Sequence, residues 1–476
     1  MRQIVFSLLL ILSFGTTSAQ NILTLEESIK IAMGESYSIK AAQFSLEGSK
    51  KNLEAVKLGL RSSVDLEFDL PNYSRSLTSE FNTATGSEQF FKFGSTKYES
   101  RLSINQPIIY TNGTISIFGS LFKRDQFSEI TGDSRDFYSN LGIRLRQPLF
   151  VFNSQMANLE RAEINLEKSE RNYTQAEREI IYNVTVGFFS LYQAKKNVEI
   201  AEEKVKQNEI SYETASNKFK AGLIAEVEAL QLEVDLASSR NELLNAQSSY
   251  QETNNNFKLL IGINLDESID VVAQLDYKPV EINLNKAIEN ALQIRSELLN
   301  AQSDIYLAEL NVDEVDSRTA IKAELNANYG INKNDDEFNK VFNEFADTRS
   351  VTFTVSVPVF DWGKNAREVE AAEADYSLRL LDVENLKETI KNEIITSVNR
   401  VNSAKARVDV LSKTVEVAEK SYSITLERFK AGTITSFDLS QMQLRLTDAR
   451  QSSLNALVDY KVALADLEKK SFLKFE

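Results

Sequence analysis

The sequence is organised around a four-residue segment that occurs twice. Phe219-Lys220-Ala221-Gly222 recurs 210 residues later as Phe429-Lys430-Ala431-Gly432. Each copy lies between two long stretches with the hydrophobic periodicity of a helix. A glycine at such a junction can adopt the left-handed backbone conformation that ends a helix and reverses the chain. The repeated segment therefore predicts two helical hairpins with their tips at Gly222 and Gly432.

The helices on either side of Gly222 are long and carry coiled-coil seams. From about Gln155 to Phe219 the pattern is unbroken, which at about 1.5 Å per residue gives a helix of roughly 100 Å. The returning helix, which runs to about Leu260, carries two seams and needs a neighbour on each side. Helices with two neighbours pack into a sheet of helices or a closed tube. The seam of the first helix alternates spacings of three and four, at Leu191, Ala194, Val198, Ala201, Val205, Asn208, Tyr212, Ala215 and Phe219.

The second half of the chain repeats the first. The opening helices of the two halves, about 23–60 and about 284–320, match at an offset of 259 residues, which leaves 49 extra residues in the first half. We interpret the chain as an internal duplication, with repeats at 20–283 and 284–476 and long hairpins at about 155–260 and about 365–470. The second seam lies 210 residues after the first, at Val401, Ala404, Val408, Leu411, Val415, Ala418, Tyr422, Thr425 and Phe429.

Between the opening helix and the long hairpin of each repeat, the hydrophobic period changes to two. In 64–70 apolar residues alternate with acidic ones, which places the carboxylates on one face of a strand. We predict strands within about 63–147 and about 322–357, and long polar loops at 71–97 and 124–137. Pro148 and Pro358, again 210 residues apart, mark the strand-to-helix transitions, because proline cannot donate to a sheet ladder but fits the start of a helix. Short turns at one end of a sheet and long loops at the other are typical of outer-membrane barrels.

The N-terminal residues have the pattern of a secretory signal peptide. Met1-Arg2-Gln3 is followed by an apolar run at 4–14 and by Thr17-Ser18-Ala19, so we predict a signal peptide at 1–19 with cleavage after Ala19. The run is too short to span a bilayer, and no later apolar run approaches the roughly 20 residues of a spanning helix. Insertion into a membrane would therefore require a β-barrel.

The composition excludes several kinds of chemistry. The chain has no histidine and no cysteine, so Ser-His-Asp triads, histidine-containing zinc sites, disulfides and lipid attachment to a processed N-terminal cysteine are excluded. A net charge of −15 argues against nucleic acid and anionic membrane surfaces as partners. Acidic pairs along the helices fit solvated faces better than cation ligands. We expect that the protein is not an enzyme and that it has no cofactor and no metal site.

Together, the signal peptide, the duplicated helix–strand–strand–helix units, the strand-ending prolines and the Phe-x-x-Gly tips resemble those of TolC-like outer-membrane efflux proteins over essentially the whole mature chain. The resemblance implies a mainly α-helical fold with a membrane β-barrel. Three chains would form a periplasmic helical tunnel continued by one shared barrel in the outer membrane of a Gram-negative bacterium. Two strands per repeat give four per chain and a 12-stranded barrel. We expect this barrel, with the extra first-half hairpin as an addition, and six strands per chain, or about 18 in all, is the alternative.

The resemblance also implies which residues close the tunnel entrance. Family members often carry, around the second-tip glycine, an aromatic residue, a basic residue and an acidic residue at the positions of Phe429, Ile434 and Asp438. Gln441 takes a second acidic position, and Glu228 is the first-tip carboxylate. An acidic ring is thus partly retained through Asp438, whereas a polar latch to Glu228 is lost, because Phe429 has no hydroxyl and Ile434 no charge. Asp438 and Glu228 also fit solvated carboxylates near helix N-termini.

The resemblance implies a passive exit duct of a tripartite efflux system for small molecules, with no chemistry of its own. Its partners would be outer-membrane lipid, a periplasmic adaptor (membrane fusion) protein, and an inner-membrane pump of the resistance-nodulation-division or ABC type. Adaptor contact is expected at the tips, around Lys220, Gly222, Lys430 and Gly432. The outer-membrane component of a type I protein secretion system is the alternative, and a pore-less periplasmic coiled-coil scaffold is a further one.

Overall fold

The computed structural model describes residues 21–82, 85–129, 132–273 and 277–475, and the predicted signal peptide lies outside them. Two compact units are each built from segments distant in sequence. Of the described residues, the helical unit contains those up to Ser45, those within Arg171–Leu299 and those from Asn385 onward. The sheet unit contains Leu46–Glu170 and Asn300–Glu384.

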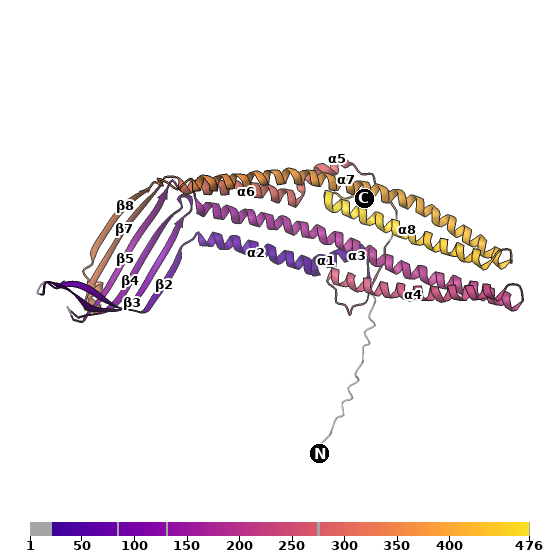
Figure 1. Cartoon of the computed structure of the whole chain (residues 1–476), viewed down its shortest axis with the longest axis horizontal. Coiled ribbons are helices and arrows are strands. Elements are labelled where there is room, and N and C mark those ends of the chain that lie inside the picture. The colour runs from indigo at the N-terminus through magenta and orange to yellow at the C-terminus, as the bar shows by residue number, and fades with distance from the viewer. Residues whose placement is uncertain (1–20, 83–84, 130–131, 274–276, 476) are drawn as a thin grey trace, which may run out of the picture. The chain divides into compact units, whose positions relative to one another are not determined.

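Four long helices form the two predicted hairpins. They are α3 (Ser154–Lys220) with α4 (Glu226–Ile261), and α7 (Lys364–Lys430) with α8 (Ser436–Ser471). Helices α3 and α7 have 67 residues each and α4 and α8 have 36 each, with every boundary offset by 210 residues. The two arms of each hairpin run side by side in Figure 1. Ion pairs join them, as between Arg240 and Glu209 and between Arg450 and Glu419, both at 2.9 Å. The equal lengths support our interpretation of a duplication.

Each opening helix is broken once, at matching positions. The first repeat has α1 (Leu25–Glu35) and α2 (Tyr37–Gly59), and the second has α5 (Leu284–Ile294) and α6 (Ser296–Asp316). Ser36 and Arg295 lie at the breaks with extended backbones, 259 residues apart. The buried Ser36 hydroxyl accepts a hydrogen bond from the amide of Ile39 at 3.4 Å and so caps α2. The sequence analysis predicted neither break, because the hydrophobic periodicity of each opening helix continues across it.

A compact core anchors the start of the chain in the helical unit. Strand β1 (Asn21–Leu23) pairs in parallel with β6 (Ile269–Val271). Buried side chains of α1, α3 and α4 pack around this pair, among them Ala32, Phe188 and Phe257. A capping box fixes the start of α1, with the Thr24 amide donating to Glu27 at 2.9 Å and the Glu27 amide to Thr24 at 3.2 Å.

All six strands of the sheet unit form one antiparallel sheet in the order β2-β3-β4-β5-β7-β8. This corrects the expectation of four wall strands plus an added hairpin, because β3 and β4 lie inside the sheet between β2 and β5. It also corrects the long loop predicted at 71–97, most of which is strand. The bounds are β2 (Ser63–Asn82), β3 (Ser87–Ile108), β4 (Gly113–Ser128), β5 (Ser134–Leu149), β7 (Lys322–Asp335) and β8 (Ala346–Ser356).

The sheet has one apolar face and one polar face over the half nearer the helices. The register places Leu66, Leu102, Gly119, Leu141 and Ile331 in one cross-strand row on the apolar face. On the polar face, a row passes through Glu67, Arg101, Ser120, Asn140 and Asn332. The segments at 71–97 and 124–137 were misread because beyond the apolar band both faces are rich in polar residues, which removes the alternation that identifies a strand.

The connection between β7 and β8 folds back over the apolar face. A short 3-10 helix, η3 (Phe338–Phe342), packs there with Val341 fully buried. The Ser139 hydroxyl donates to the Val341 carbonyl, and the Phe137 and Phe338 rings meet edge to face at 5.5 Å. In the part of the chain that the structure describes, no helix is long and apolar enough to cross a membrane.

Gly262 allows the end of α4 to approach the corner between α1 and α2. Its φ is +82°, and a Cβ added there would lie 2.5 Å from the carbonyl oxygen of Glu35. We therefore predict that Gly262→Ala lowers stability by about 1–3 kcal/mol through backbone strain and steric clash. Thermal unfolding followed by circular dichroism should show a lower midpoint. Gly34→Ala, in open space within α1, is the control and should not lower it; equal midpoints for the two variants would contradict the close contact.

Candidate functional site: the hairpin tips

Both chain reversals have the same backbone geometry. At the first tip, the amide of Gly222 donates to the Phe219 carbonyl at 2.8 Å and that of Leu223 to the Lys218 carbonyl at 2.9 Å. At the second, the amide of Gly432 donates to the Phe429 carbonyl at 3.0 Å, and the next amide donates in the corresponding way at 3.0 Å. These are Schellman motifs, which need a left-handed residue after the helix. Gly222 and Gly432 supply it with φ of +73° and +76°.

The side chains at the two tips differ, although the backbones match. Phe429 is 1% exposed and lies in an apolar cluster between the two hairpins, whereas its counterpart Phe219 is 40% exposed. The cluster, called here the tip core, also contains Ala215, Ala229, Leu232, Tyr422, Leu439 and Leu446. The second tip thus packs its phenylalanine between the two hairpins, whereas the first tip leaves the corresponding ring partly exposed.

Lys218 holds Phe429 in place from the first hairpin. Its Nζ donates a hydrogen bond to the Phe429 carbonyl and lies 4.4 Å from the centroid of the Phe429 ring. The lysine thus satisfies a carbonyl at the C-terminus of α7, where the helix dipole favours a cation. A cation over an aromatic face adds about 0.5–1 kcal/mol or more. Ile434 packs against the tip core from the other side of the turn.

Asp438 belongs to a capping box at the start of α8. The Thr435 amide and hydroxyl donate to its carboxylate at 3.1 and 2.9 Å, and the Asp438 amide donates to the Thr435 hydroxyl at 3.3 Å. The hydrogen bond from the Thr435 hydroxyl, followed by that from its amide, lowers the pKa of Asp438 below its usual value. The carboxylate is exposed to solvent, so it is an ionised group at the tip surface.

The other predicted site residues lie around this arrangement. Glu228 is in the first turn of α4, half-buried, and Gln441 is exposed on α8. Lys220 and Lys430 are the last residues of α3 and α7; both are exposed, and Lys430 forms an ion pair with Glu427 at 2.9 Å. The structure therefore brings Phe429 and Ile434 together in the tip core and places the charged residues outside it.

Sequence reasoning missed a polar contact between the hairpins. The Ser440 hydroxyl of α8 donates to the Asp235 carboxylate of α4 at 2.6 Å, and the Gln231 amide donates to the other carboxylate oxygen at 3.2 Å. The signal was available: 210 residues after Asp235 the sequence has Arg445, and 210 before Ser440 it has Leu230. The change of polarity between the two copies at these positions agrees with a contact that only one copy makes.

The predicted strand-to-helix residues lie at the other end of the long helices, in the sheet unit. Pro148 is paired opposite Glu324 near the end of β5, and Pro358 follows β8. The aromatic residues after the prolines are largely exposed, including Phe150, Phe360 and Trp362. The Phe360 and Trp362 rings meet at 4.8 Å between centroids.

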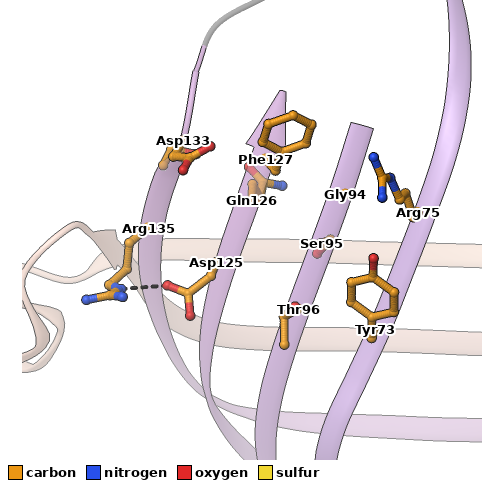
Figure 2. Close-up of a pocket in the computed structure, with 11 residues that line it drawn as sticks. Tyr73, Arg75, Gly94, Ser95, Thr96, Asp125, Gln126, Phe127, Asp133 and Arg135 are labelled. Carbon is orange, nitrogen blue, oxygen red and sulfur yellow. Dashed lines mark hydrogen bonds and ion pairs between the residues drawn. The ribbon is translucent and has the colours of Figure 1, made fainter. Parts of the chain in front are cut away.

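An open hollow at the other end of the sheet offers no chemistry for catalysis. Figure 2 shows Tyr73, Arg75, Asp125, Phe127 and Arg135 around it, with Arg135 paired to Asp125 at 2.6 Å. Asp125 is also paired with a lysine of its own strand at 2.9 Å, so its carboxylate serves as a counter-ion. Within the described residues, no cluster of acidic side chains could hold a metal ion.

The fold is shared with solved outer-membrane channels. The crystal structure of CusC superposes with a TM-score of 0.71 at 14% identity, covering 95% of this chain and 93% of that one. The outer-membrane channel CmeC of Campylobacter jejuni gives a TM-score of 0.71 at 16% identity, covering 95% and 86%. At such low identity these likenesses establish the fold.

The family follows from the sequence. The family model for "Outer membrane efflux protein" matches residues 123–263 and 287–470, and the chain belongs to this family. SilC of Salmonella typhimurium, a probable outer membrane lipoprotein, is 21% identical over 284 residues, which are 58% of this chain and 59% of SilC. The Escherichia coli cation efflux system protein CusC is 20% identical over 334 residues, 68% of this chain and 70% of CusC.

Membership confirms the resemblance on which the sequence analysis relied. The family consists of efflux channels of the Gram-negative outer membrane, and these are not enzymes. Such channels are homotrimers that work with adaptor proteins and inner-membrane pumps. The match with SilC spans about three fifths of that relative's length.

The burial of Phe429 predicts unequal effects of matched substitutions. Phe429→Ala should destabilise the packing of the tips locally by about 3–5 kcal/mol, because it leaves a cavity in the tip core. Phe219→Ala removes a half-exposed ring and should have a much smaller effect. Amide hydrogen exchange over residues 415–445 should become markedly faster in the first variant only; similar exchange in both would show that the tip core does not depend on Phe429.

Proposed function

We propose that the chain is one subunit of a homotrimeric exit duct, which passively carries small molecules across the outer membrane. The observation that carries this proposal is the amphipathic sheet with two open edges. Within the described residues, β2 and β8 each pair with a single neighbouring strand. A sheet with unpaired backbone at both edges cannot lie in lipid, where every backbone polar group needs a partner. Other copies of the chain can supply these partners.

Aromatic residues support a position for the sheet in the bilayer. Phe137 lies toward one end of β5 and Phe150 follows its other end, 13 residues away. That is roughly 44 Å of strand, or roughly 30 Å of membrane depth at the usual tilt of about 45°. The hydrocarbon core is about 30 Å thick. Phe338 near one end, with Phe360 and Trp362 near the other, would add to the two aromatic girdles.

The helical hairpins would continue the barrel as a periplasmic tunnel, with the tips at its entrance. The adaptor would contact the exposed end of each hairpin, around Gly222 and Gly432, with Lys220 and Lys430 nearby. An inner-membrane pump, of the resistance-nodulation-division or ABC type, would supply the energy. The sequence match to a protein named as a cation efflux component favours small solutes over secreted proteins as cargo.

Channel measurements on the purified protein would test the duct. We expect a trimer by mass in detergent and discrete conductance steps in planar bilayers. The pore-less scaffold predicts extraction without detergent and no conductance, and either result would refute the proposal. Deleting the gene should raise susceptibility to small toxic solutes and leave the secreted proteome unchanged; a selective loss of a secreted protein would favour type I secretion.

We further propose that Asp438 contributes an acidic ring at the entrance. Asp438→Asn should reduce cation selectivity, measured as the reversal potential under a salt gradient. Because the pKa of Asp438 is lowered, the unsubstituted channel should keep this selectivity well into the acid range and lose it only as the pH falls through the lowered value. Gln441→Ala is the control. Unchanged selectivity in Asp438→Asn channels would refute this role, whether or not the duct conducts.

A further inference from the structure

Over part of their length, the two open edges of the sheet lack the proline, lysine and bulges that usually prevent strand pairing. Natural edge strands are kept apart by lysine, proline, bulges or shortness. Strand β8 has 11 residues without proline, glycine or lysine. In β2 the stretch from Ser63 to Asp69 is likewise free of them, and a bulge with Pro71 follows between Asp69 and Asn72. Both edges are therefore suited to pairing over about seven residues.

We propose that β2 of one copy pairs antiparallel with β8 of the next, and that three copies close an 18-stranded barrel in which all six strands of each chain form the wall. This inference rests on the trimeric duct proposed above. Direction permits it: the strands alternate along the sheet, and with an even number per chain the first and last strands run in opposite directions. Each junction between copies is then antiparallel, like those within a chain.

The faces of the two edge strands match. On β8, Val351, Phe353 and Val355 lie on the apolar face, and each is more than half exposed. On β2, the apolar face carries Val64, Leu66 and Phe68, also more than half exposed. Pairing in register by face would continue the apolar band around the barrel without a polar gap. Slippage by one residue would place these side chains on the wrong face.

Charge is also compatible on the polar face. Glu67 and Asp69 of β2 form ion pairs with Arg101 of the same chain, at 3.2 and 3.1 Å. The polar face of β8 offers only hydroxyls over the same stretch, from Ser350, Thr352 and Thr354. Like charges placed directly opposite each other would be destabilising. The proposed pairing of β2 with β8 avoids this on the polar face.

The inserted strands would widen the exit. Barrel diameter grows roughly linearly with strand number, so 18 strands give a diameter about 1.5 times, and a cross-section about twice, that of a 12-stranded barrel. Strands β3 and β4 account for this difference, because each fills a full place in the sheet. The 49 residues by which the first half exceeds the second thus change the size of the barrel itself.

Cysteine pairs in the trimer can test the wall directly, because the chain has no cysteine of its own. Glu67 lies opposite Arg101, Arg101 opposite Ser120, and Ser120 opposite Asn140. With Glu67→Cys and Arg101→Cys, mild oxidation should form a disulfide within each chain. With Glu67→Cys and Asn140→Cys it should not, since three strand spacings, about 14 Å, exceed the reach of a disulfide. A wall without β3 and β4 would place β2 beside β5, and the cysteines at positions 67 and 140 would then form a disulfide.

A second set of cysteine pairs, one cysteine in β2 and one in β8, tests the junction between copies. Glu67→Cys combined in turn with cysteine at Ser350, Thr352 or Thr354 should yield covalently linked trimers on non-reducing gels for at least one position. Glu67→Cys with Phe353→Cys, on opposite faces, should not. Absence of every such link in an intact trimer would overturn the proposed junction. A β2–β5 disulfide in an intact trimer would overturn the strand number, and a protein that is not trimeric would overturn the duct itself.

Discussion

Unpaired backbone at the edges of the sheet is the constraint on which the rest of the architecture depends. A six-stranded sheet with an apolar face cannot end in lipid, and the chain has no further strand beside β2 or β8 within the described residues. In the proposed duct the missing hydrogen bonds come from outside the chain, and identical copies would provide them with the least demand on sequence. In the proposed duct, oligomerisation is thus a requirement of the sheet rather than an addition to it.

The alternation of strand direction explains why the sheet can contain the two additional strands of the first half. An antiparallel sheet accepts two more strands at any internal position, because a hairpin preserves the alternation of strand direction. Strands β3 and β4 pair on both sides along most of their length. Their faces also match those of their neighbours, with Leu102 and Gly119 on the apolar side and Arg101 and Ser120 on the polar side. One strand alone would have left two neighbours parallel.

Sequence reasoning was most successful where a pattern is local and repeated. The tips at Gly222 and Gly432 and the helices beside them follow from periodicity and a left-handed glycine, and the structure places both where they were expected. It failed for the strands around Tyr73 and Thr96, because alternation disappears where both faces are polar. It also failed for the partners of β3, because long-range pairing depends on register between distant segments, which no local pattern encodes.

The tips show why the positions of the two chain reversals could be predicted from the sequence, whereas the packing of their side chains could not. A duplication predicts two equal tips, yet two hairpins that pack against each other share one interface and cannot fill it with both copies of the same ring. Phe429 occupies that interface and Phe219 does not. Two polar contacts accompany the buried Phe429 ring. Lys218 donates a hydrogen bond to the Phe429 carbonyl, and Ser440 donates one to the Asp235 carboxylate. Phe429 and Ile434, the two residues at which the resemblance implied the loss of a polar latch, are thus residues that pack at the apolar tip core.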